Sequence, residues 1–368
     1  MKSNYKAKLN SALHGIEIAY SKPDDSSLTL LETIISPPGY MVKMVLSYLY
    51  GHSLPSGGDK SEWQIPLIFK GLTFILTDYK RYKCKIYGQK NGNLVGTSLR
   101  KKLEIASNIM NSYISEESKA YFDAEDIFLQ NNYYKISSIY DDFYEQLELM
   151  IAESPSKKVK CDEVKDIGHF LNMEIERKRK INGYLIATTL FFFAITEVLL
   201  DACFALGDRQ GLTYKEFRSL DWSTRFKMFF DLSSDASLSS DYNDLLQVRR
   251  YYRNVPVHGD PVFFFPLKDF GLIPANYDSF NTPQMMPSFS IEKADVRDYL
   301  RLYDRVISYF SCGESSKYAY IYVESDFPIP IRKKSAEELK KYMTSQSEFE
   351  EELRHRSLYQ DALDNMEI

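Results

Sequence analysis

The segment INGYLIATTLFFFAITEVLLDACFAL, residues 181–206, is apolar on almost every side of a helix and decides how the chain folds. A membrane span is the obvious alternative. The longest uncharged stretch, residues 181–196, has only 16 residues, and Glu197 and Asp201 follow it. A bilayer needs about 20 apolar residues, and a carboxylate near its centre costs about 2.5 to 3.5 kcal/mol. We therefore predict a helix that lies buried in the core of a soluble protein.

Two carboxylates on this helix require partners. Glu197 and Asp201 are four residues apart, so they lie on one helix face. A buried carboxylate needs a cation or hydrogen-bond donors beside it. Arg249 and Arg253 are also four residues apart. Antiparallel packing of the two helices would pair Glu197 with Arg253 and Asp201 with Arg249. The alternative is that one carboxylate points to solvent at a helix edge.

The second helix ends in the sequence RNVPVHGD, residues 253–260. Apolar side chains recur at intervals of three and four residues, which predicts a helix over residues 241–254 (Leu245, Val248, Tyr252 and Val255). The proline inside the motif disfavours helical geometry at the residue before it, and the following glycine is a typical helix stop. His258 is therefore expected just past the helix end, near Arg253 and Asn254.

An arginine, a carboxamide and a histidine at one helix end suit chemistry on a phosphate. A guanidinium group can hold a phosphate with two parallel hydrogen bonds. Histidine is the side chain best suited to exchange protons near neutral pH. A short motif also arises by chance, so the alternative is an ordinary helix end with an exposed Arg253.

These elements resemble a HEPN domain, the helical module of many ribonuclease toxins and phage-defence effectors. The resemblance rests on FFFAITEVLL (residues 191–200), WSTRFKMFFDL (222–232) and RNVPVHG (253–259), and it covers roughly residues 165–310. The last segment matches the family's Arg-x(4–6)-His motif, including the polar residue after arginine and the glycine after histidine. The proline inside the motif is a less usual feature.

The resemblance implies a metal-independent endoribonuclease, in which the 2′-hydroxyl of RNA attacks the adjacent phosphorus and leaves a 2′,3′-cyclic phosphate. Arg253 and His258 would form the active site, Asn254 would support them, and Glu197 would complete the polar cluster. The reaction moves two protons, whereas each chain has one motif histidine. A homodimer that brings two motifs together would supply both histidines, and the family suggests the same arrangement. The implied setting is a cytoplasmic toxin or antiviral-defence effector that acts on RNA, with an inhibitory or sensor partner.

Two other functions stay open. The chain could be a catalytically inactive HEPN-like module that serves as a dimerisation or RNA-binding scaffold. It could also be a helical interaction protein in which residues 253–258 are only a helix cap. Cleavage of RNA in the presence of a chelator separates the first function from both alternatives, and RNA binding separates the two alternatives from each other.

Composition argues against metals and cofactors. The cysteines and histidines outside the motif are scattered and lack zinc-ligand spacing (Cys84, Cys161, Cys203 and Cys312; His14, His52, His169 and His355). The sequence contains neither a phosphate-binding loop nor a dinucleotide fingerprint. We therefore expect no metal, no cofactor and no membrane association.

The net charge of −5 disfavours indiscriminate coating of nucleic acid, since nonspecific affinity grows with the number of phosphate contacts. Two local basic runs remain, at residues 80–85, where tyrosines are interleaved, and at residues 177–180. Either run could guide an RNA backbone. The alternative for each is a solvated face of a strand or a helix.

We expect an α+β, mainly α-helical protein in three parts. Residues 1–155 would form a smaller mixed amino-terminal sensor or substrate domain, with β-rich runs and a hairpin turn at residues 91–92. Residues 156–315 would form an all-helical HEPN-like bundle. Residues 316–368 would add a strand-like segment at 318–323 and a charged helical tail.

Overall fold

The computed structural model describes residues 2–19, 28–34, 39–50, 63–79, 83–152, 164–254, 263–267, 271–277, 283–285, 293–314 and 316–365. The chain divides into two compact units, Met1–Ala124 and Glu125–Ile368. The division falls after residue 124 rather than at the expected residue 155, because helix α4 (Tyr133–Ala152) packs along helix α5 (Val164–Leu206). The fold is mainly helical with antiparallel sheets, which confirms the expected α+β class.

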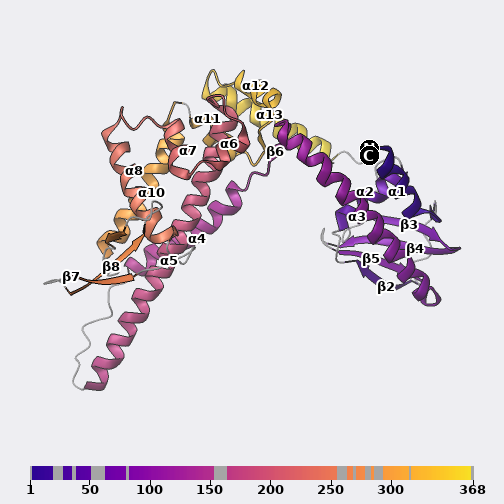
Figure 1. The fold of residues 1–368 in the computed structure, drawn as a ribbon, viewed down its shortest axis with the longest axis horizontal. Helices are drawn as coiled ribbons and strands as arrows, with labels where there is room; N and C mark the ends of the chain where they lie inside the picture. Colours follow the sequence, from indigo (N-terminus) through magenta and orange to yellow (C-terminus); the bar gives the residue numbers. More distant parts are fainter. Residues whose placement is uncertain are drawn as a thin grey trace. The chain divides into compact units, whose positions relative to one another are not determined.

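The first unit is a five-stranded antiparallel sheet packed with three helices (Figure 1). The sheet order is β1-β3-β4-β5-β2. The elements are α1 (Ser3–Leu13), β1 (Ile16–Ile18), β2 (Thr29–Ile34), α2 (Gly39–Tyr50), β3 (Gln64–Phe69), β4 (Leu72–Tyr79), β5 (Lys83–Gly88), the 3-10 turn η2 (Lys90–Gly92) and α3 (Asn93–Asp123).

The three helices pack on one face of this sheet. Along β3, Ile65, Leu67 and Phe69 alternate with less buried residues and join the same apolar cluster as the helices. This is the period of two expected for a strand with one buried face. The expected hairpin turn at residues 91–92 is wrong. Those residues belong to η2, which leads directly into α3.

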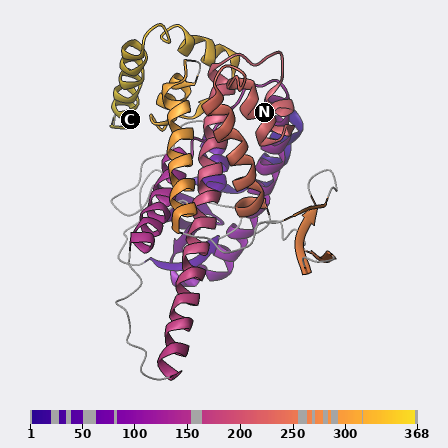
Figure 2. The same ribbon diagram turned by 90° about the vertical axis from the view of Figure 1, so that its left-hand side faces the viewer.

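The second unit is a helical assembly around α5 (Figures 1 and 2). Besides α4 and α5 it contains β6 (Phe128–Leu129), α6 (Tyr214–Ser219), α7 (Trp222–Phe229), α8 (Ala236–Val248), the π-helical turn η3 (Arg249–Asn254), β7 (Phe263–Leu267), β8 (Gly271–Tyr277), β9 (Pro283–Met285), α10 (Lys293–Cys312), α11 (Lys317–Val323), β10 (Ile329–Pro330), α12 (Lys333–Lys340) and α13 (Gln346–Asn365). The three-stranded sheet β7-β8-β9 lies within residues 156–315, so that part is not all-helical as expected.

Large aromatic side chains pack α5 against the other helices of this core. Phe192 stacks on Tyr303 of α10 with ring centroids 4.2 Å apart, and Phe193 meets Trp222 of α7 edge-on at 5.2 Å. A polar contact adds to this packing. Thr196 accepts a hydrogen bond of 2.9 Å from the Trp222 indole nitrogen. The position of α7 beside α5 is therefore fixed by both apolar and polar contacts.

Residues Asn172–Leu206 of α5 are long and apolar enough to cross a membrane, with a mean hydropathy of 1.9. However, 72% of the apolar window is buried inside the unit. Its apolar surface is already covered by protein, as expected for the core helix of a soluble protein. The predicted buried helix is thus confirmed.

The helix that carries the motif differs in detail from the expectation. It begins at Ala236, five residues before the predicted start at 241, because Asp235 accepts hydrogen bonds from the backbone of Ser237 and Leu238. It then changes from an α-helix to the π-helical turn η3 at Arg249. Such turns are rare and occur frequently at functional sites.

In the last part of the chain, the expected strand-like segment is wrong. Residues 318–323, expected to be strand-like, belong to α11. Tyr318, Ala319, Tyr322 and Val323 are buried, and this spacing of one, three and one residues is that of a helix face. Packing outweighs the β-propensity of the tyrosines and the valine. The charged tail is helical as expected, in α12 and α13.

Candidate active site

The expected pair between α5 and the motif helix is present. Arg253, on η3, donates from Nη2 to Oε1 of Glu197 on α5 at 3.0 Å. Both side chains are about a quarter exposed, at 26% and 25%. The pair is therefore shielded on one side and open on the other, so the remaining guanidinium donors of Arg253 can reach a ligand.

The second expected pair is wrong. Asp201 does not pair with Arg249 but with Arg218 of α6, whose Nη1 lies 3.3 Å from both carboxylate oxygens. The prediction assumed regular helical spacing between the two arginines. The π-helical turn, which begins at Arg249, alters that spacing, and α6 supplies a competing cation.

A third arginine lies at the centre of the cluster. Arg225 of α7 has a side chain only 6% exposed, and it lies 3.8 Å from Glu197 and 4.0 Å from Asp201. The sequence interpretation did not identify it. A signal was present, because Arg225 falls between Trp222 and Phe226 on the buried face of α7. A cation on an apolar helix face predicts a buried anionic partner.

Burial dominates the electrostatics of these groups. It raises the pKa of Asp201 to about 6, with Glu197 adding to the shift while Arg218 and Arg225 oppose it. Burial also lowers the pKa of Arg225. The pKa of Arg249 is lowered by burial and by the neighbouring charge of Arg253. The site thus holds several cations at close quarters in a poorly solvated place.

The cluster has an excess of positive charge and of hydrogen-bond donors. Within the described residues, Glu197 and Asp201 face four guanidinium groups (Arg218, Arg225, Arg249 and Arg253), and Asp221 adds a third carboxylate, which acts on Arg249 more strongly than Glu197 does. Buried donors at Nε and Nη1 of Arg225 and at Nε of Arg249 have no hydrogen-bond partner in the part of the chain that the structure describes. An anion is the ligand that such a site favours.

Aromatic rings set the positions of the arginines. The Arg249 guanidinium lies 5.9 Å from the ring centre of Trp222, and that of Arg253 lies 5.9 Å from Phe193. Both distances fall within the range of cation–π attraction. The rings are core residues of α7 and α5, so the charges are held against the rigid part of the fold.

Of the predicted site residues, Glu197 and Arg253 come together. Asn254 follows Arg253 as the last residue of η3, and its buried Oδ1 has no hydrogen-bond partner among the described residues. An unsatisfied buried carboxamide is uncommon and indicates a place where a ligand or another group can bind. His258 lies outside the described residues.

The two basic runs differ in their exposure and in how much of each the structure describes. Arg177 donates to the backbone oxygen of Met150 at 2.7 Å, so it ties α5 to α4 and has a structural role. The next three residues of that run, Lys178 to Lys180, are exposed. In the run at residues 80–85, residues 80–82 lie outside the described part of the chain, while Lys85 is half-buried in β5.

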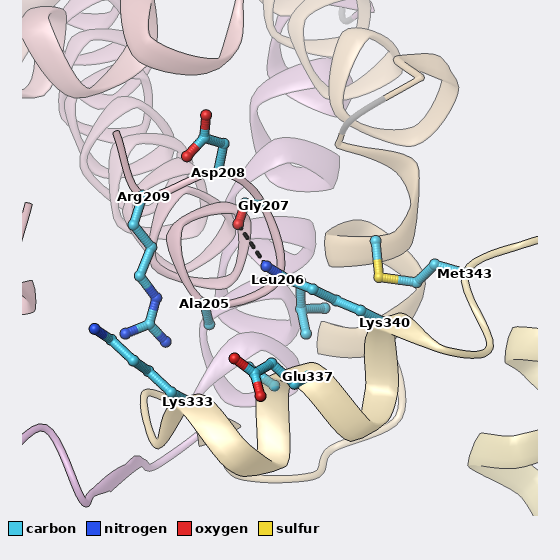
Figure 3. A pocket seen from close by; sticks show the side chains of 10 residues that line it. Ala205, Leu206, Gly207, Asp208, Arg209, Lys333, Glu337, Lys340 and Met343 are labelled. Atoms are coloured by element: carbon cyan, nitrogen blue, oxygen red, sulfur yellow. Dashed lines mark hydrogen bonds between the residues drawn. The ribbon is translucent and has the colours of Figure 1, made fainter. Parts of the chain in front are cut away.

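A separate pocket of about 640 Å³ lies at the end of α5, beside α12 (Figure 3). Lys340 crosses it to donate to the Gly207 carbonyl oxygen at 2.8 Å. Arg209 donates to the Ile331 carbonyl oxygen at 2.6 Å and pairs with Glu125 at 3.3 Å. The interactions of these two cations join elements of the fold. We therefore interpret the pocket as a structural junction.

Comparisons with known protein families, with curated proteins and with solved structures find no match for this chain. The functional argument therefore rests on the residues of the arginine cluster and on the resemblance carried by the motif.

Proposed function

We propose that the protein is a metal-independent endoribonuclease of the HEPN type. The observation that carries the proposal is the ion pair between Arg253 and Glu197 at 3.0 Å, next in the chain to Asn254, whose buried amide oxygen has no partner among the described residues. The pairing was expected from sequence spacing alone, and it places the arginine of the motif in a cluster with unused guanidinium donors. A phosphodiester is an anion of the kind that this cluster favours.

His258 lies outside the described residues, and the chain connection alone limits its distance from the motif arginine. It is four residues beyond Asn254, and covalent geometry limits the distance between their Cα atoms to about 14 Å. A histidine within that reach is available to the phosphate that Arg253 holds. It is the residue of the motif that can exchange protons near neutral pH.

In the proposed reaction the 2′-hydroxyl of RNA attacks the adjacent phosphorus, and the bond to the 5′-oxygen breaks. The products are a 2′,3′-cyclic phosphate and a 5′-hydroxyl, so no protein nucleophile is consumed. His258 moves a proton between substrate and solvent. Arg253 stabilises the charge that develops on the phosphoryl oxygens, and Asn254 orients the substrate or the arginine. Glu197 holds Arg253 in place.

The reaction requires one proton to be removed and another to be delivered, whereas each chain supplies one motif histidine. We therefore propose a homodimer that brings two motifs together. By the same resemblance we propose a cytoplasmic toxin or antiviral-defence effector, in which the amino-terminal unit senses a signal or binds a substrate and a partner restrains the nuclease.

The test is cleavage of mixed RNA by the purified full-length protein in excess EDTA. His258→Ala should lower the rate by about 10² to 10⁴, the typical cost of losing a positioned acid or base. His355→Ala is the matched control, because His355 is an exposed histidine on α13 in the same unit. It should cleave like the wild type.

Each outcome assigns a function. Equal cleavage by folded His258→Ala would eliminate the mechanism. RNA binding without cleavage by the wild type would favour an inactive HEPN-like scaffold. Neither binding nor cleavage would favour a helical interaction protein in which the motif is a helix cap.

A further inference from the structure

The second unit contains another pocket, of about 610 Å³, that the proposed nuclease does not use. It lies among α4, α5, α10 and α11 and is lined mainly by tyrosines and carboxylates (Tyr133, Tyr134, Tyr140, Asp141, Asp304 and Glu324). Ile195 of α5 also lines it. Because Ile195 and Glu197 are two residues apart, they point to nearly opposite sides of α5. The pocket is therefore distinct from the arginine cluster.

The pocket is negatively charged without a compensating cation. Four carboxylates line it (Asp141, Asp142, Asp304 and Glu324), and no lysine, arginine or histidine is among the lining residues. In the described part of the chain, none of the four is in an ion pair. Burial and the neighbouring Asp142 raise the pKa of Asp141, and no cation opposes that shift. The pocket at the end of α5 is different, since three cations line it (Arg209, Lys333 and Lys340).

One tyrosine hydroxyl in this pocket has no partner. Tyr134 donates to the Glu324 carbonyl oxygen at 2.6 Å, and Tyr133 bonds to Tyr320. Tyr140 is only 9% exposed, yet its hydroxyl makes no hydrogen bond within the described residues. Tyr140 lines the pocket, and its hydroxyl is not among the fully buried polar atoms, so a ligand in the pocket can hydrogen-bond to it.

The residues around Tyr140 indicate which kind of ligand could bind to its hydroxyl. Its ring packs against Phe192, with centroids 6.5 Å apart, and is fixed in the core. After burial, the largest influence that raises its pKa is the negative charge of Asp304, with Asp141 also contributing. A hydroxyl that feels the charge of two carboxylates can accept a hydrogen bond from a cationic donor that the carboxylates attract.

The geometry favours an organic cation over a metal ion. Within the described residues, no three acidic, histidine or cysteine side chains converge closely enough to hold a metal. The carboxylates instead lie on separate elements, α4, α10 and the end of α11, around tyrosine rings. Separated charges match a ligand whose positive groups are spaced along a chain, and aromatic faces attract ammonium groups. A pocket of this volume is of the size that holds small ligands.

We propose that this pocket binds a linear aliphatic polyamine, with one ammonium group donating to the Tyr140 hydroxyl and the others lying beside Asp141 and Asp304. The proposal is independent of the nuclease, because it involves neither the motif nor RNA.

The test is isothermal titration calorimetry of the full-length protein with spermidine, without RNA, in a chelator-free buffer of low salt. Spermidine should bind at one site per chain, while butylamine and Mg²⁺ should bind far more weakly. Tyr140→Phe should weaken binding about tenfold, the size expected for one lost hydrogen bond to a charged group. Its melting temperature should not fall, because the hydroxyl has no partner to lose.

A charge control distinguishes this site from general attraction to an acidic protein. The double variant Asp141→Asn, Asp304→Asn should lose at least about tenfold in affinity. Asp298→Asn removes a carboxylate from the same helix, α10, at a side chain that is 68% exposed and outside the pocket. That control should bind spermidine like the wild type.

Several results would overturn the proposal: no binding of spermidine at millimolar concentration, equal weakening by Asp298→Asn, or full affinity in Tyr140→Phe. Butylamine carries a single ammonium group like that of a lysine side chain. Binding of butylamine as tight as that of spermidine would refute a polyamine and indicate a protein lysine as the ligand.

Discussion

Glu197→Gln should destabilise the helical unit by about 3 to 5 kcal/mol, the cost of leaving a buried charge without its partner. Arg253→Gln should cost only about 1 to 2 kcal/mol, less than a typical buried charged hydrogen bond because the pair is a quarter exposed. The asymmetry follows from Arg225. After Arg253 is removed, Glu197 keeps Arg225 at 3.8 Å. After Glu197 is removed, the buried Arg225 keeps only Asp201 at 4.0 Å.

The free energy of unfolding can be measured for this unit alone. The chain has two tryptophans, Trp63 in the first unit and Trp222 beside the arginine cluster. In a Trp63→Phe background, fluorescence during urea unfolding reports on Trp222, which is 1% exposed. The indole nitrogen of Trp63 has no hydrogen-bond partner among the described residues, so this background change removes none of the hydrogen bonds described.

Both single variants and the double variant complete the cycle. We expect a coupling energy of about 1 to 2 kcal/mol between Glu197 and Arg253. Losses that add within about 0.5 kcal/mol would show that the two side chains do not interact. Equal losses in the two single variants would refute the role given to Arg225.

Three further predictions concern single residues. Because burial raises the pKa of Asp201 to about 6, the folded state binds this proton more tightly than the unfolded state, and stability from this group is lost as pH rises from about 4 to 6. The stability of the wild type relative to Asp201→Asn should therefore fall by about 3 kcal/mol over that range in urea unfolding, and a constant difference would rule this out. Thr196→Val should lower the free energy of unfolding by about 1 to 3 kcal/mol, because it leaves the buried Trp222 donor unsatisfied, and the melting temperature should fall. An unchanged melting temperature would mean that the 2.9 Å hydrogen bond does not contribute to stability. Arg253→Lys should abolish most RNA cleavage while the protein stays folded, since an ammonium group cannot reproduce the guanidinium fork; full activity would exclude bidentate phosphate binding.

Sequence patterns predicted the features that depend on one helix or one pair of helices. The buried helix at residues 181–206 was predictable because its apolar surface is too large to leave exposed, and because two carboxylates, Glu197 and Asp201, follow its 16 uncharged residues. The pairing of Glu197 with Arg253 was predictable because a buried carboxylate must find a cation. Helix α10 is a feature of the same local kind, because its apolar residues recur at helical spacing (Val296, Leu300, Tyr303, Ile307 and Phe310).

Features that depend on a third element were not predictable in the same way. Asp201 pairs with Arg218 because α6 folds back beside α5. The spacing of residues in the sequence does not predict that contact. The π-helical turn at Arg249 alters the register that a regular helix would have given. Residues 318–323 read as a strand because tyrosine and valine favour strands, yet packing against the core makes them helical.

The most direct test of the central claim is cleavage, in EDTA, of an RNA oligonucleotide that carries a single 2′-deoxy sugar. If the 2′-hydroxyl is the nucleophile, the protein should cut the flanking linkages to give 2′,3′-cyclic phosphate ends and should leave the linkage at the deoxy sugar intact. Cleavage at that linkage would contradict the account, because it would require an external nucleophile such as an activated water.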